Sequence, residues 1–143
     1  MELNNTHLSG EYFVAAELYR RGFSVGMTIG NAKAIDLFAN KDNKTVSVQI
    51  KAIRNKKSGG WPMMKDKIIQ NILYIFVNLN DQFAPDYYIC TSEEAKEKVK
   101  QYTTRGIINL VALRSEQFRD RWDKLETLLL PISSKTAVNK KIK

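Results

Sequence analysis

The residue types and spacing in the first third of the chain suit catalysis at four positions: Glu11, Asp36, Gln49 and Lys51. Together they offer two carboxylates, an amide oxygen and an ammonium group. Hydrolysis of a phosphodiester needs such a set, because the phosphate oxygens must be neutralised and a water molecule must become nucleophilic. A divalent cation held by oxygen ligands does both, and a lysine can orient or deprotonate the water.

Glu11 belongs to a predicted helix with apolar residues at helical spacing. It lies three residues after Leu8 and four before Ala15, so its side chain projects from the apolar face of the helix. A carboxylate on that face loses hydration unless a cation or a donor compensates it. Alternatively, Glu11 lies at the rim of the apolar face and reaches water. His7, one turn earlier, is interpreted as an ordinary residue near the helix start.

The other three side chains lie on two strands that are predicted to form a hairpin. Asp42 and Asn43 suit a two-residue turn between these strands, since both residue types tolerate a positive φ. A turn at this position sets Lys41 opposite Lys44 and thereby fixes the register of the whole hairpin.

That register determines which side chains share a face of the sheet. Counting outward from the turn sets Asp36 opposite Gln49, with Cβ atoms about 5 Å apart, and places Lys51 on the same face as Gln49. The residues around Asp36 are apolar, so its strand is predicted to be covered on both sides, and an acid there needs a cation or donors. The alternative is that Gln49 and Lys51 belong to a solvent-facing side, and a one-residue slip would remove the pairing.

These residues occur in a pattern that resembles the PD-(D/E)XK nucleases. Gly10-Glu11, with Gly22-Phe23 closing the helix, is similar to the first helix of that group, above all in archaeal Holliday-junction resolvases and related small prokaryotic nucleases. Ile35-Asp36-Leu37 resembles the metal-binding aspartate motif, and Gln49-Ile50-Lys51 resembles the (D/E)XK motif with glutamine in the acidic place. The resemblance covers about residues 8–53. It implies a restriction-endonuclease-like α/β fold with three layers, α/β/α, around a central mixed sheet.

The resemblance also implies an endonuclease that uses Mg²⁺ (or Mn²⁺) to hydrolyse DNA. Asp36 would be the principal metal ligand, with the side-chain carbonyl of Gln49 and the backbone carbonyl of Ile50 on the same ion. Lys51 would position the attacking water, and Glu11 would hold a second metal ion or a water molecule attached to one. Because the Gln49 amide carries no charge, weaker metal affinity is expected, and a catalytically inactive nucleic-acid-binding module of the same fold is the alternative.

The charge of the chain favours a polyanionic partner. The net charge is +8, which attracts nucleic acid, and nucleic-acid contacts are predicted for the basic residues after Lys51, namely Arg54, Lys56, Lys57 and Lys65. An ordinary solvated loop is the alternative, and a third hypothesis is an interaction protein whose charge is incidental. A duplex or branched DNA substrate favours a homodimer, although no sequence feature marks the dimer surface.

Cysteine usage and hydropathy favour a cytoplasmic location and no membrane partner. Cys90, the single cysteine, cannot form an intrachain disulfide and is expected to be buried and inert. The first six residues lack the features of a signal peptide, and the longest strongly apolar run, Ile72–Val77, is far too short to span a bilayer. A zinc site is not expected, because His7 is the only other soft ligand.

The elements that must position these residues follow from hydrophobic periodicity and turn residues. One domain is expected over 1–131, with a basic flexible tail over 132–143. Helices are predicted over 7–21, 92–103 (with Ser92 as N-cap) and 115–130. Strands are predicted over 23–29, 34–39, 45–53, 72–79, 86–91 and 106–113, and a basic, flexible loop is predicted over 54–67. Trp61 in this loop is expected to cover the edge of the core, and stacking on a base is the alternative.

Overall fold

The structure of the chain, a computed structural model, describes residues 3–29, 34–55 and 57–132. In chain order, the first elements are α1 (Leu3–Arg20), β1 (Ser24–Met27), β2 (Leu37–Lys41), β3 (Lys44–Ile53), β4 (Gly60–Pro62) and the 3₁₀-helix η1 (Lys65–Lys67). They are followed by β5 (Leu73–Asn78), β6 (Asp86–Thr91), α2 (Ser92–Lys98), β7 (Lys100–Gln101), β8 (Gly106–Asn109), α3 (Leu110–Leu113), α4 (Lys124–Leu128) and β9 (Leu130–Pro131). The predicted DNA contact Lys56 and the predicted tail from 133 onward lie outside the described residues.

Five strands form the main sheet in the order β1-β2-β3-β5-β6, and β9 pairs with the first residues of β3. Strands β3 and β5 run parallel, whereas the other neighbours run antiparallel. The predicted α/β class with a central mixed sheet is therefore confirmed. Strand β5 is buried along its whole length, which explains its continuous apolar sequence.

The β2–β3 hairpin has the predicted turn and register. Asp42 (φ 53°) and Asn43 (φ 58°) adopt the left-handed conformation that their short polar side chains tolerate. Pairing runs outward from this turn as far as Leu37, which lies opposite Val48. Asp36 is the next residue outward and lies just before β2. The predicted strand over 34–39 had placed it inside the strand.

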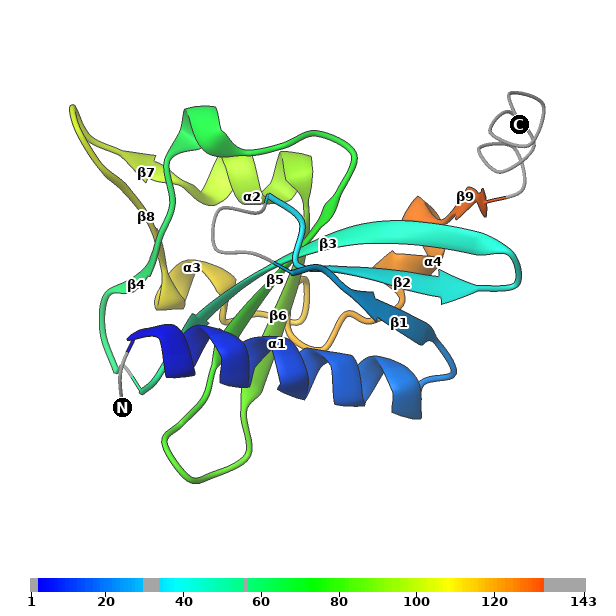
Figure 1. Cartoon of the computed structure of the whole chain (residues 1–143). Coiled ribbons are helices and arrows are strands. Elements are labelled where there is room, and N and C mark those ends of the chain that lie inside the picture. The colour runs from blue at the N-terminus through cyan, green and yellow to red at the C-terminus, as the bar shows by residue number, and fades with distance from the viewer. Residues whose placement is uncertain (1–2, 30–33, 56, 133–143) are drawn as a thin grey trace.

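Helix α1 covers one face of the main sheet (Figure 1). Its buried residues pack with apolar side chains of β2, β3 and β5 in one core cluster. A Cβ on Gly10 would lie 2.5 Å from the Cβ of Ala52, so glycine is what allows the helix to lie close to β3 at this point. Although α1 has 18 residues, neither it nor any other described helix is long and apolar enough to cross a membrane.

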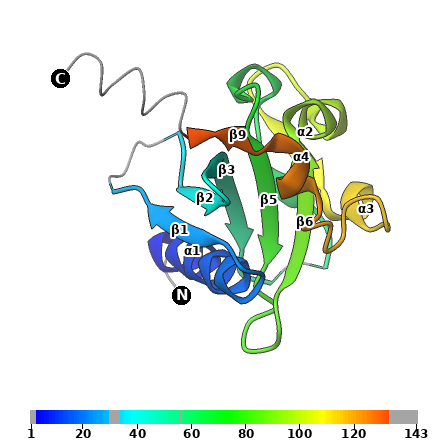
Figure 2. The ribbon, with the colours of Figure 1, turned by 90° about the vertical axis from the view of Figure 1, so that its right-hand side faces the viewer.

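The opposite face of the main sheet is covered by α2, α3 and a second sheet with the order β4-β8-β7 (Figures 1 and 2). Trp61 of β4 is fully buried there, and its Nε1 donates to the Val77 carbonyl at 3.0 Å, so it lies inside the core and not at the edge, where it was predicted. A Cβ on Gly60 would overlap the carbonyl oxygen of Ile108. This glycine therefore serves close strand pairing, and the prediction of a flexible loop over 54–67 was wrong for the part that forms β4 and η1.

The predicted helix over 115–130 is wrong. Only Lys124–Leu128 is helical, and the preceding segment runs along the outer edge of β6, where the Phe118 carbonyl accepts a hydrogen bond from the Ile89 N–H at 2.8 Å. This path carries Phe118 into the core cluster on one face of the sheet and Trp122 into the cluster on the other. A single helix presents its apolar residues on one face and cannot serve both clusters.

The bounds of α2 and β8 also differ from the prediction. Helix α2 ends at Lys98, and its N-cap is Thr91 rather than Ser92. The Thr91 hydroxyl accepts from the Glu94 N–H at 3.2 Å, and the Glu94 carboxylate accepts from the Thr91 N–H at 2.9 Å, which forms a capping box. The predicted strand over 106–113 ends at Asn109, and α3 follows directly.

Candidate metal centre

Glu11 projects from α1 toward the start of β2 and is almost fully buried, with 1% of its surface exposed. One helical turn earlier, Nε2 of His7 lies 2.7 Å from Oε2 of Glu11. The same nitrogen lies 3.6 Å from Oδ1 of Asp36. The predicted inward orientation of Glu11 is thus confirmed, and the alternative of a carboxylate at the rim of the helix is wrong.

Asp36 is held against the middle of β3 by two hydrogen bonds and is 2% exposed. Its Oδ2 accepts from the Ile50 N–H at 2.6 Å, and its own N–H donates to the Val48 carbonyl at 2.9 Å. The N–H and C=O of one strand residue face the same neighbouring strand, so the Ile50 carbonyl faces the side of β3 on which Asp36 lies.

The three side chains form a group whose chemistry fits a divalent cation. One ligand atom each from His7, Glu11 and Asp36 lies within 4.8 Å of the others. Two buried carboxylates so close together repel each other unless positive charge lies near them. Carboxylate oxygens are the ligands that Mg²⁺ and Mn²⁺ prefer, and an imidazole nitrogen is tolerated by Mn²⁺ and later transition metals.

Gln49 and Lys51 line a pocket of about 330 Å³. Its other walls come from the segment that spans β4 and η1 and from the turn that precedes β8. Oε1 of Gln49 is buried and has no hydrogen-bond partner within the described part of the chain. Ile50, whose N–H donates to Asp36, lies between Gln49 and Lys51, so Asp36 meets β3 at the residue between the two that line the pocket.

No protein-family model matches the sequence, and no curated protein matches it significantly. The solved structure of a bacterial homing endonuclease, I-Ssp6803I, is similar to this one with a TM-score of 0.61, and the match covers 96% of this chain and 97% of that chain. The chain has the fold of this homing endonuclease. The two sequences are 12% identical, and at this distance the likeness establishes the fold and not the activity.

The described residues that were predicted to contact nucleic acid lie outside the pocket. Nε of Arg54 is 2.8 Å from Oδ1 of Asp81, so the charge of this arginine is partly compensated. Lys57 and Lys65 are exposed, and Lys65 lies beside Lys96 of α2. Of these predicted contacts, those that the structure describes do not line the pocket.

Three residues at the site were not given a role from the sequence, namely His7, Lys67 and Arg105. His7 had a usable signal, because a residue one turn before Glu11 shares its face of the helix. Lys67 had only its place in a basic segment. Arg105 had no signal at all, since the pairing of β4 with β8 that brings it to the pocket is a contact between segments far apart in the sequence.

Proposed function

We propose that this protein is a metal-dependent endonuclease of the PD-(D/E)XK group that hydrolyses phosphodiester bonds in DNA. The observation that carries the proposal is the meeting of His7, Glu11 and Asp36 within 4.8 Å, in a chain with the fold of a homing endonuclease. The order of a helix acid, a strand acid and Gln49-Ile50-Lys51 supports the PD-(D/E)XK group. The net charge of +8 supports DNA as the partner.

Asp36 and Glu11 would hold Mg²⁺ or Mn²⁺, together with the side-chain carbonyl of Gln49 and the backbone carbonyl of Ile50. When bound, the ion would neutralise phosphate oxygens and make a neighbouring water molecule more acidic. The unpartnered Oε1 of Gln49 supports this ligand set, because a buried carbonyl oxygen is unfavourable until a ligand satisfies it. A neutral amide contributes less charge than a carboxylate, so we expect weaker affinity than in a site built from three acids.

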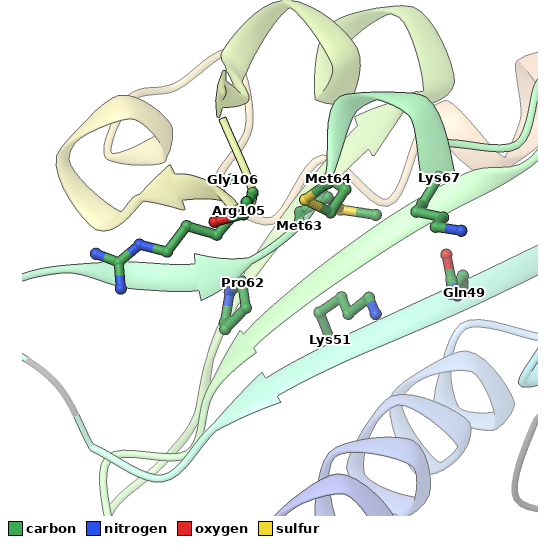
Figure 3. Close-up of a pocket in the computed structure, with 9 residues that line it drawn as sticks. Gln49, Lys51, Pro62, Met63, Met64, Lys67, Arg105 and Gly106 are labelled. Carbon is green, nitrogen blue, oxygen red and sulfur yellow. The ribbon is translucent and has the colours of Figure 1, made fainter. Parts of the chain in front are cut away.

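The protein groups around these ligands orient the ligands and the substrate. The Ile50 N–H donates to Oδ2 of Asp36 and restricts that carboxylate to one orientation. Nε2 of His7 lies 2.7 Å from Oε2 of Glu11 and would restrict the orientation of that second carboxylate. The ammonium group of Lys51 projects into the pocket, where it would orient the attacking water and stabilise negative charge that develops on the phosphate (Figure 3).

The second candidate function is a nucleic-acid-binding module that has the fold without cleavage. The observation that favours it is Gln49, which replaces a charged metal ligand by a neutral one. This candidate predicts salt-sensitive DNA binding that survives the substitution Asp36→Ala without loss. The nuclease proposal predicts instead that cleavage requires Asp36.

A duplex or branched substrate has two strands to cut, so we propose that the protein acts as a homodimer. The outer stripe of α1, formed by Leu8, Tyr12, Phe13 and Tyr19, is a suitable contact surface because each residue is at least 38% exposed and none is charged. In a two-fold contact the same residues meet each other. An uncharged stripe therefore avoids the repulsion that two chains of net charge +8 would experience through basic surfaces.

The test is a cleavage screen with purified protein over supercoiled plasmid, linear duplex, single strands and branched junctions, with Mg²⁺, Mn²⁺ or chelator. The wild type should cut at least one form, only with metal, and Asp36→Asn should lose this activity. Asp42→Asn is the matched control, because Asn accepts the positive φ of the hairpin turn and Asp42 lies at the opposite end of β2 from Asp36. The proposal fails if the wild type cuts no form, or if Asp36→Asn cuts as fast as the wild type.

A further inference from the structure

The pocket beside Gln49 contains a second lysine, Lys67, which η1 contributes from the wall opposite Lys51. In Figure 3 the ammonium groups of both lysines point toward the Gln49 amide, whereas the guanidinium group of Arg105 points away from it. Two cations and one carbonyl oxygen thus converge on a single region of the pocket.

No described residue balances the charges in this region. Among the described residues, neither Lys51 nor Lys67 forms a hydrogen bond or an ion pair through its ammonium group, and no acid lines the pocket. Two ammonium groups that face one region repel each other, and an anion between them removes that repulsion. The arrangement therefore suits a ligand with negative charge.

The position of Lys67 is set by a fixed element rather than by a free loop. The Lys67 N–H donates to the Met64 carbonyl at 3.1 Å, and the Lys65 N–H donates to Oε1 of Gln101 in β7 at 2.8 Å. The Met63 N–H donates to the carbonyl of Gly106 at 3.0 Å. These bonds tie η1 to the second sheet, so the chain presents the Lys67 side chain from a defined place.

We propose that Lys67 binds a phosphate group of the DNA backbone in this pocket, opposite Lys51, and so positions the strand for attack at the neighbouring carboxylate group. The inference rests on the DNA-binding part of the proposed function. The pocket volume of about 330 Å³ is far larger than the roughly 30 Å³ that one water molecule takes up in the liquid, so a phosphodiester group can enter. Because the contact is to the backbone, it adds affinity and orientation but no sequence preference.

The experiment measures equilibrium binding of a fluorescent DNA duplex across a range of salt concentrations, in chelator and in the Asp36→Asn background, so that no cleavage is needed. The test variant is Lys67→Met, and Lys67→Arg keeps the charge. The control is Lys96→Met, which removes a lysine from an exposed position on α2 outside this pocket. Loss of one phosphate contact should lower the slope of log affinity against log salt by about 0.9 and weaken binding about equally for unrelated sequences.

The proposal is supported if Lys67→Met lowers the salt slope while Lys67→Arg and Lys96→Met keep the slope of the parent protein, Asp36→Asn. It is overturned if Lys67→Met keeps the parent slope, or if its midpoint of thermal unfolding alone changes, which would mean that Lys67 only supports the fold near Gln49. A wild type that cuts DNA together with an unchanged slope in Lys67→Met refutes this inference and leaves the nuclease proposal standing. A lowered slope in Lys67→Met, together with a wild type that cuts no DNA, supports this inference and refutes the nuclease proposal.

Discussion

Nε2 of His7 lies 2.7 Å from Oε2 of Glu11, one turn further along α1, and 3.6 Å from Oδ1 of Asp36. The imidazole therefore lies against both buried carboxylates, and in the proposed metal site it would either bind the shared ion or orient Glu11. Both roles make the affinity for a divalent metal depend on His7. The side chain is 40% exposed, so its removal leaves the core intact.

We expect His7→Ala to weaken Mg²⁺ or Mn²⁺ binding by about 10- to 100-fold, the usual effect of removing a group that orients a metal ligand. Asp36→Ala should lose binding altogether. Isothermal titration calorimetry on both variants measures these effects. Asn5→Ala is the control, because two residues along a helix lead to nearly the opposite side of α1. Unchanged affinity in His7→Ala would show that the contact with Glu11 has no part in metal binding.

Lys124 is expected to be essential for stability rather than for activity. It is 8% exposed, and its Nζ donates to the Glu94 carboxylate at 2.9 and 3.2 Å, to the Ile89 carbonyl at 2.9 Å and to the Gln117 carbonyl at 2.7 Å. Lys124→Met leaves these acceptors without their donor and should cost about 3 kcal/mol of unfolding free energy. Urea denaturation measures the loss, with the exposed Lys96→Met as control. A loss no larger than that of the control would mean that the acceptors find water instead.

The carboxyl group of Glu94 predicts how stability changes in acid. Burial alone raises its pKa, but the Thr91 N–H, Lys124 and Gln117 outweigh burial and lower the pKa below its ordinary value of 4.5. A carboxyl group with a lower pKa in the folded chain stabilises the fold above the unfolded-state pKa, and this stabilisation is lost as the pH falls through the folded-state pKa.

Glu94→Gln should therefore be less stable than the wild type at pH 7, and the two should converge as the pH falls below about 4.5. Thermal unfolding between pH 7 and pH 3 measures this difference. Glu93→Gln, an exposed neighbour on the same helix, is the control and should follow the wild type. A constant difference between Glu94→Gln and the wild type at all pH values would contradict the assigned cause.

The parts of the fold that the sequence predicted depend on local chemistry. The Asp42-Asn43 turn requires residues that tolerate positive φ, and the turn alone sets the register that brings Asp36 to β3. The inward position of Glu11 follows from its helical spacing to Ala15 and Leu18, which are buried, whereas Leu8, which the prediction also counted on that face, is exposed. In each case the deciding interaction lies within a few residues or within one hairpin.

The parts that the sequence did not predict depend on contacts between distant segments. The segment before α4 has the apolar spacing of a helix, but Phe118 and Trp122 pack into core clusters on opposite faces of the sheet. This packing against distant segments determines the path of the chain. Lys67 and Arg105 meet at the pocket only because β4 pairs with β8. No local pattern in either segment predicts that pairing, so the sequence did not indicate that Lys67 and Arg105 line the pocket.

The homodimer proposal makes a prediction about the outer stripe of α1. Tyr12, at its centre, is 64% exposed, and in a two-fold contact it lies near its own copy. Tyr12→Lys would place two like charges in that contact, where repulsion and desolvation both oppose association. Sedimentation velocity should show a dimer for the wild type and a monomer for Tyr12→Lys at the same concentration.

Phe83→Lys, at an 81% exposed position in the loop between β5 and β6, is the control and should remain dimeric. If both variants dimerise like the wild type, the two chains meet through a surface other than α1, whereas a monomeric wild type removes the dimer itself.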